Sequence, residues 1–371
     1  MLHKETFKSA ATIMGFTIGA GLLGIPYVIA QAGFLTAIPV LLIIAILTLY
    51  LNLATGEVAL RTNDNHQFPA LVKKYLGKSW SKLMFVDILF LGYGALTAYI
   101  IGGGQIITDL FGGSNFYNSI LFGLILSLFV LMNINFFEDF ESIFMILLLL
   151  TIIGIFFLSW KHFSFSNLSG FIPMKAYVPL ATILFAFFGA TSVPEVKEEL
   201  KSLKNMKSAI LIAVIIISLV YLLFSAIVVG VSGSVTTEVA SVGVSNIIGF
   251  GGKLLFSIFA LIAIITSFVA MGFVLKDTFK LDFGFKKNSA WFMTIIVPMT
   301  VFLSGFVSFI KVLNIVGVIH AILLTYIVFN LLRAAKLKGE RQPEYSLKTH
   351  PFLELIIYII LVLGGVLVLF F

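Results

Sequence analysis

The chain has 371 residues, of which 60% are hydrophobic and 11% are charged, and its mean hydropathy is +1.11. Soluble domains carry about 25% charged residues, so this composition excludes a water-soluble globular protein and predicts a membrane protein. The formal net charge is +7, and the absence of cysteine excludes disulfides, thiolate metal sites and thiol catalysis.

Apolar runs long enough to cross a bilayer follow one another along the chain, given that a spanning helix needs about 20 mainly apolar residues. The first residues, Met1 to Ser9, are polar and contain no apolar stretch with a cleavage site, so we expect the N-terminus to be retained. The eleven candidate spans are 7–31, 36–60, 83–110, 118–134, 142–160, 178–195, 207–231, 253–276, 289–305, 308–330 and 352–371.

Lysine and arginine collect in alternate loops between these spans. With the N-terminus in the cytoplasm, all but four of the 24 basic residues lie on the cytoplasmic side; the four are Lys161, Lys175, Lys253 and Lys311. This asymmetry follows the positive-inside rule. It predicts a multi-pass protein of the cell membrane with a cytoplasmic N-terminus and an external C-terminus. The positive charge then reflects topology and indicates no nucleic-acid partner.

Helix-breaking residues interrupt two of the spans. They are Gly15, Gly19, Gly21, Gly24 and Pro26 in the first span, and Gly189 and Pro194 in the sixth. A single glycine is more often explained by close helix packing. The second cluster, however, lies five spans after the first, an odd number, so the interrupted helices enter from opposite sides. Paired interruptions of this kind point to two inverted halves with a transporter's binding site between them. The expected units are 1–160, 161–335 and a final loop and helix, 336–371.

Three segments resemble a known family of membrane proteins. They are TIMGFTIGAGLLGIPYVIAQAGF (12–34), YGALTAYIIGGGQIITDLF (93–111) and FAFFGATSVPEVKEELK (185–201). They are similar to the amino acid/auxin permeases and the related aromatic and hydroxy amino acid permeases of the amino acid–polyamine–organocation superfamily. The resemblance covers nearly the whole chain and implies an all-α membrane protein with the leucine-transporter fold, a 5+5 inverted repeat and an eleventh transmembrane helix. The G-x-G-x-x-G motif follows no strand and is therefore not a dinucleotide fingerprint.

The two interruptions predict a binding site for an α-amino acid that is built mainly from backbone. Unwinding in the first span would expose N–H groups for the substrate carboxylate, and the end of the half-helix in the sixth span would offer carbonyls to the ammonium group. Tyr93, Thr97 and Tyr99 lie near the middle of the third span, where a side chain could close the pocket, with ordinary helix packing as the alternative. The candidate backbone segments are Ile18, Gly19, Ala20, Gly21 and Leu22, and Phe188, Gly189, Ala190 and Thr191.

The coupling ion stays open between Na⁺ and H⁺. Thr266 and Ser267 are adjacent hydroxyls in the eighth span, and the resemblance implies that such a pair completes an oxygen cage for Na⁺ with first-span carbonyls near Gly15 and Ile18. Sodium-coupled relatives place an asparagine near Gly15, where glycine offers no side-chain oxygen. Glu195, next to Pro194, is the first choice for a protonatable carboxylate. No cofactor is expected apart from such a bound Na⁺.

Three further ionisable residues fall within predicted spans. For Glu57 we expect a structural ion pair with a nearby basic residue, and the same interpretation applies to Asp87. His320, in the middle of the tenth span, is interpreted as a packing histidine rather than a proton relay.

The sequence therefore predicts a secondary active transporter that moves a small neutral amino acid by alternating access, coupled to Na⁺ or H⁺ or by exchange. Its partners are the amino acid, the coupling ion and the lipid bilayer. A membrane-embedded enzyme is the alternative, but no H-E-x-x-H or G-x-S-x-G motif is present. A channel would show filter-like repeats or rings of charge, and the sequence has neither.

Overall fold

The computed structural model describes residues 2–132, 141–245 and 247–370, and the regular structure within them is helical. The long helices are α1 (Leu2–Thr17), α3 (Phe34–Leu60), α5 (Lys78–Phe111), α6 (Asn115–Met132), α7 (Glu141–Ser159), α10 (Met206–Ser232), α12 (Gly249–Phe283), α13 (Lys287–Leu303), α14 (Phe309–Lys338) and α15 (Pro351–Phe370). The shorter ones are α2 (Ile25–Ala32), α4 (Phe68–Leu76), α8 (Leu180–Ala186), α9 (Val193–Glu199) and α11 (Ala240–Ser245). Short 3₁₀ helices are η1 (Ala20–Leu23), η2 (Trp160–His162), η3 (Phe165–Leu168), η4 (Pro173–Lys175), η5 (Leu203–Asn205) and η6 (Gly233–Val235).

Seven of the described helices are long and apolar enough to cross a membrane, and the count is eight when α1 and α2 are taken as one broken span. This finding confirms a multi-span membrane protein. The predicted spans that do not meet this requirement of length and hydropathy are helical as well. They correspond to α7, the α8–α9 pair and α13. The end of the predicted span 118–134 and Phe371 of the last span lie outside the described residues.

Both predicted interruptions coincide with breaks in helix. The halves of the first span, 5–17 and 20–32, are bent by 60° at residues 18 and 19, and the segment 187–192 separates α8 from α9. Pro26 and Pro194 each sit in the first turn of the helix that follows the break. Proline is tolerated there because the first amides of a helix have no intrahelical acceptor.

The two breaks lie side by side in the bundle. A Cβ on Gly21 would come within 3.1 Å of the Ala186 backbone at the end of α8, and a Cβ on Gly189 would come within 2.1 Å of the Thr17 hydroxyl. A side chain at Gly21 would crowd the end of α8, and one at Gly189 would require the Thr17 side chain to move. The glycines that interrupt the helices therefore also allow the two interruptions to touch.

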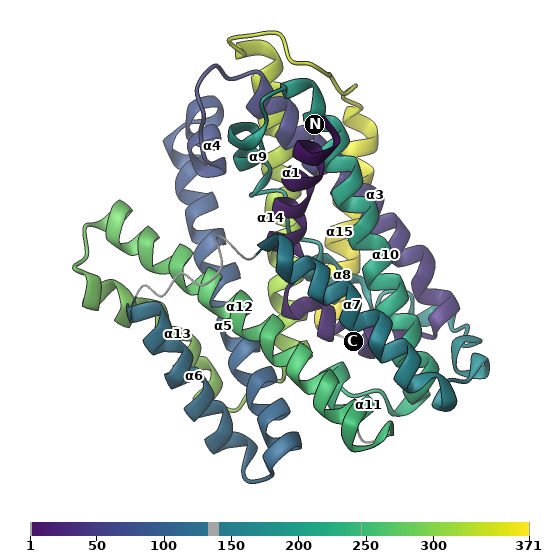
Figure 1. Ribbon diagram of the computed structural model, residues 1–371. Coiled ribbons are helices and arrows are strands. Elements are labelled where there is room, and N and C mark those ends of the chain that lie inside the picture. The colour runs from purple at the N-terminus through teal and green to yellow at the C-terminus, as the bar shows by residue number, and fades with distance from the viewer. Residues whose placement is uncertain (1, 133–140, 246, 371) are drawn as a thin grey trace.

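The remaining helices form the ends and one flank of the molecule (Figure 1). The α4 and α9 helices lie near the start of the chain at one end, and α11 lies at the opposite end. A flank is made by α5, α6, α12 and α13, which contact one another. The division into halves at 1–160 and 161–335 stays a prediction.

Glu57 anchors the loop between α14 and α15 on the end of α3. Its carboxylate is fully buried, pairs with Arg61 at 2.8 Å, and accepts hydrogen bonds from Ser346 Oγ and the Leu347 N–H. The structural ion pair expected for Glu57 is thus confirmed. Burial, and then the Glu57 carboxylate, raise the pKa of Tyr345. Its hydroxyl stays protonated at neutral pH and donates to the backbone of α3.

Lys197 fastens the end of α9 to the loop after α3. Its side chain is buried, and its Nζ donates to the carbonyl oxygens of residues 62–64 at 2.7 to 3.2 Å. Hydrogen bonds from a charged donor contribute about 1.5–3 kcal/mol, so we expect Lys197→Met to lower the melting temperature of the detergent-solubilised protein. Lys201→Met is the matched control, because that side chain is 86% exposed and pairs only loosely with Glu5, at 3.3 Å. Equal melting temperatures for the two variants would contradict the assignment.

Candidate functional site

A cavity of about 560 Å³ lies where the two helix breaks meet. Its walls come from α1, η1, α5, the end of α8 and α12, and most of the lining is small or aromatic. Next to the breaks the lining residues are Gly15, Phe16, Thr17, Gly19, Gly21, Leu91, Ala95, Tyr99, Phe185, Ala186, Phe188 and Ser267. Farther along α12 they are Ala270, Met271, Phe273, Val274, Asp277 and Lys280. The volume suffices for an amino acid together with solvent.

Backbone amides are available at the break in the first span. Ile18 still donates to the Met14 carbonyl, and regular bonding resumes at Leu22, whose N–H donates to the Gly19 carbonyl. Between them, the amides of residues 19–21 donate to no backbone carbonyl in the described part of the chain. Gly19 and Gly21 line the cavity, whereas Ile18, Ala20 and Leu22 are buried beside it.

The segment between α8 and α9 contributes mainly Phe188 to this cavity. The Gly189 carbonyl is occupied, because it accepts hydrogen bonds from the N–H and the hydroxyl of Ser192. Gly189 and Ala190 face a second, smaller cavity, and Thr191 is partly buried. The proposed ammonium site at these four residues stays a prediction.

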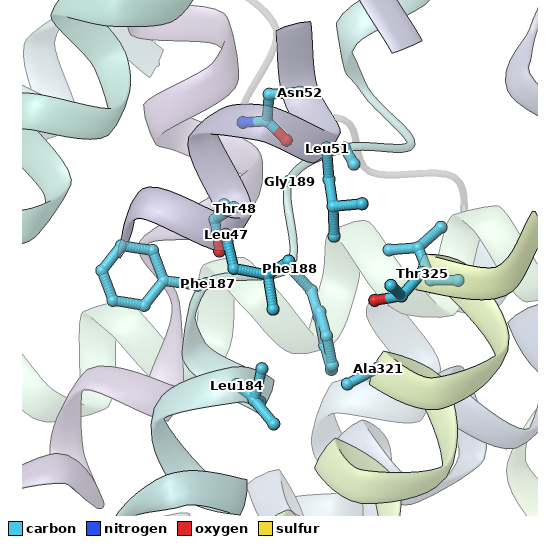
Figure 2. A pocket seen from close by; sticks show the side chains of 12 residues that line it. Leu47, Thr48, Leu51, Asn52, Leu184, Phe187, Phe188, Gly189, Ala321 and Thr325 are labelled. Atoms are coloured by element: carbon cyan, nitrogen blue, oxygen red, sulfur yellow. The ribbon is translucent and has the colours of Figure 1, made fainter. Parts of the chain in front are cut away.

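The smaller cavity, of about 10 Å³, lies on the other side of Phe188 between α3, α8 and α14 (Figure 2). Its polar lining includes Thr48, Asn52 and Thr325. Neither polar atom of the Asn52 amide nor the Thr325 hydroxyl finds a hydrogen-bond partner in the described residues. A space of this size with such a lining suits one water molecule.

Of the three α5 residues named as candidates to close the pocket, only Tyr99 lines the large cavity. Leu91, Ala95 and Tyr99, four residues apart, line the cavity. Tyr93 instead donates its hydroxyl to the backbone of Met293 on α13, and Thr97 bonds the carbonyl of Tyr93 within its own helix. The small Ala95 between two larger residues was the available sequence signal for the inward face.

The candidate residues for ion coupling separate in space. Gly15 and Ser267 line the cavity, and the Oγ of Ser267 lies 2.7 Å from the position that a Gly19 Cβ would take. The Thr266 hydroxyl donates to the Ala263 carbonyl of its own helix. Glu195 lies in the first turn of α9, is partly exposed, and lines neither of the two cavities. Within the described residues, no group of three His, Cys, Asp or Glu side chains could hold a metal ion.

Tyr221 of α10 was missed by the sequence analysis. Its side chain is fully buried, and its hydroxyl lies 2.6 Å from the carbonyl oxygen of Ala186 and 3.1 Å from that of Thr17. These two carbonyls end α8 and α1, so one hydroxyl joins the two broken helices. A lone tyrosine in the otherwise apolar span 207–231 was the available signal.

Asp87 and His320 form a buried pair that the sequence analysis treated as two separate residues. Asp87 Oδ2 and His320 Nδ1 are 2.7 Å apart, and the side chains are 0% and 1% exposed. The ring of Phe188 packs edge-on against the imidazole, with ring centroids 4.1 Å apart. The pair therefore lies directly behind a residue of the cavity wall.

Comparison with known proteins gives the same family over the whole chain. The model of the tryptophan/tyrosine permease family matches residues 3–370. Glutamine transporter 2 of Aliivibrio fischeri is 25% identical over 345 residues, 88% of each chain, and tyrosine-specific transport system 1 of Haemophilus influenzae is 25% identical over 348 residues, 85% of each chain. The tryptophan-specific transport protein of Shigella flexneri is 32% identical over 103 residues, which are 27% of this chain and 24% of that protein.

Proposed function

The chain belongs to the tryptophan/tyrosine permease family and is an amino acid permease rather than an enzyme, and we propose that it is a secondary active transporter for a neutral amino acid. The observation that carries the proposal is the cavity between the two helix breaks. Among the described residues, the charged ones in its lining are Asp277 and Lys280 on α12, and Asp277 lies ten residues from Ser267, about 15 Å along the helix. A neutral substrate fits a site without a charged side chain at the breaks.

The substrate's two charges would be read by backbone groups. We place the carboxylate at the amides of Gly19 and Gly21, which lie ahead of the positive end of α2. Tyr99, Phe185 and Phe188 then form an apolar and aromatic wall for the side chain. This wall suits the aromatic side chains of tyrosine and tryptophan, which the names of two relatives give as their substrates.

Alternating access would use the leucine-transporter fold with its two inverted halves. The large cavity extends along α12 to Lys280, an end that the positive-inside rule assigns to the cytoplasm. On the opposite side, the buried Phe309 fills the space between Gly24 and Gly102. These features support an inward-facing conformation with a closed outer path, in which the N-terminus is cytoplasmic.

Transport would be coupled to a cation gradient. Ser267, beside Gly15 and Gly19 in the cavity wall, supplies one oxygen to a Na⁺ site of the kind the resemblance implies. The Thr266 hydroxyl would have to leave the Ala263 carbonyl to supply a second. A proton is the other candidate, and the two ions are separable by experiment.

The proposal is tested by uptake into proteoliposomes that contain the purified protein. We expect counterflow of at least one of radiolabelled tyrosine, tryptophan, glutamine and alanine, and none of lysine or aspartate. Imposing sodium and proton gradients separately then identifies the coupling ion. No counterflow of any amino acid above that of protein-free liposomes would overturn the proposal, and flux that internal substrate does not stimulate would favour a channel.

A further inference from the structure

We infer that Asp87 and His320 form a proton-binding site that couples transport to the pH gradient, and that Phe188 controls its access to the cavity. The inference rests on the proposed function, because a proton can be coupled only to a substrate that is transported. It replaces Glu195 as the protonatable group, since Glu195 lines neither cavity.

The pair is an isolated ionisable unit at membrane depth. It joins α5 to α14 across 233 residues of sequence. Its second oxygen, Asp87 Oδ1, and its second ring nitrogen, His320 Nε2, are buried and find no hydrogen-bond partner among the described residues. Ionisable groups inside a membrane protein are costly and are retained where they carry ions or protons.

One proton changes the charge of this unit. An ionised Asp87 beside a neutral His320 carries a charge of −1, and one added proton makes the pair neutral. In a medium of low dielectric constant the net charge matters strongly, because an uncompensated buried charge is poorly solvated. Loading and release of that proton therefore alter the electrostatic environment between α5 and α14.

Charged and titratable groups on the surrounding helices have partners or positions elsewhere. On α5, Tyr93 hydrogen-bonds the Met293 carbonyl and Asp109 pairs with Lys253. On α4, Tyr75 hydrogen-bonds Thr62. The lysines of these two helices are exposed, namely Lys73, Lys74, Lys78 and Lys82. On α3, α14 and α15, Glu57 pairs with Arg61, Arg333 with Glu354 and Lys336 with the Leu347 carbonyl. On α12 and α13, Lys276 bonds the Val130 carbonyl, Asp277 and Lys280 line the cavity, and Lys287 is exposed.

Phe188 connects the pair to the binding site. Its ring contacts the imidazole, and the same residue lines both the large and the small cavity. Figure 2 shows its side chain extending from the α8–α9 connection towards Ala321, the neighbour of His320 on α14. This connection is not helical, so a rearrangement of α8 and α9 would move Phe188 and uncover the imidazole to whichever side the cavity then faces.

The test separates proton coupling from substrate movement. Asp87→Asn and His320→Gln keep the size of each side chain but remove the titratable group. We expect both variants to retain counterflow of radiolabelled tyrosine, tryptophan or glutamine, which needs no net proton movement. Both should lose accumulation driven by a pH gradient and the accompanying acidification of the lumen, which trapped pyranine reports. Asp109→Asn, on the same helix but paired with Lys253, is the control that should keep both activities.

Unchanged pH-driven accumulation in both variants would overturn the inference. So would the parallel loss of counterflow in variants that remain monodisperse, because that result assigns the pair to structure alone. Should the variants aggregate, calorimetry of wild-type substrate binding in buffers of different ionisation enthalpy decides the matter: proton uptake on binding supports the site, and its absence refutes it. A wild-type protein without any counterflow refutes the proposed function instead.

Discussion

Gly19→Val is expected to abolish substrate binding while leaving a folded, monodisperse protein. A Cβ at this position would lie 2.7 Å from Ser267 Oγ and 3.8 Å from the Tyr99 hydroxyl, inside the cavity wall. The added methyl groups would stand where the carboxylate is proposed to approach the backbone amides. Gly19→Ala should be milder, since the Ser267 side chain can rotate, with a loss of affinity of about tenfold, or about 1.4 kcal/mol.

Equilibrium binding of radiolabelled substrate to purified protein checks this expectation. Gly251→Val is the control, because a Cβ there would meet no atom within 4 Å. The double variant Gly19→Ala, Ser267→Ala tests the steric contact between the added Cβ and the Ser267 hydroxyl. Without Oγ, the nearest remaining atom is the Ser267 Cβ at 3.5 Å, an ordinary contact, so binding measured without Na⁺ should recover. Any stimulation of binding by Na⁺ should stay lost, because the proposed Ser267 ligand is gone. Wild-type affinity in Gly19→Val would show that the substrate does not approach this backbone.

Local chemistry made the helix breaks predictable from the sequence. Gly19, Gly189 and the prolines that follow them act on their own backbone, and no distant contact is needed to place a break there. The same holds for Glu57, whose partner Arg61 is one helical turn away. Structural features that depend on residues four or fewer positions apart could thus be predicted from the sequence.

The sequence alone did not show how each helix is rotated about its axis, because this rotation is set by packing against helices that are distant in the sequence. Tyr93 and Tyr99 lie on one apolar helix with little difference in hydrophobicity between its faces, and only the packed bundle shows that Tyr99 faces the cavity. In the same way, only the packed bundle shows that Ser267 lines the cavity while Thr266 does not. The contact of Asp87 with His320 joins two spans that the sequence places far apart. The 1–160 and 161–335 halves stay a prediction for the same reason.

Tyr221→Phe is the second substitution with a large expected effect. The hydroxyl is shared by the Ala186 and Thr17 carbonyls, each at the C-terminal end of a half-helix, where carbonyls have no intrahelical donor. Removing it leaves these buried acceptors without that donor, at a cost of about 1–3 kcal/mol. We expect a lower melting temperature and a weaker apparent affinity, because the two breaks that form the site lose their common link.

The pattern across substrates identifies how Tyr221 acts. It does not line either cavity, so its loss should weaken uptake of tyrosine, tryptophan and glutamine by the same factor. Tyr99→Phe changes a residue of the wall and should alter the ranking of the three. Tyr117→Phe, at a side chain 72% exposed on α6, should leave affinity and melting temperature unchanged. A Tyr221→Phe variant that loses uptake of only one substrate would contradict a role through the backbone, since a hydroxyl that positions both helix ends must affect every ligand held between them.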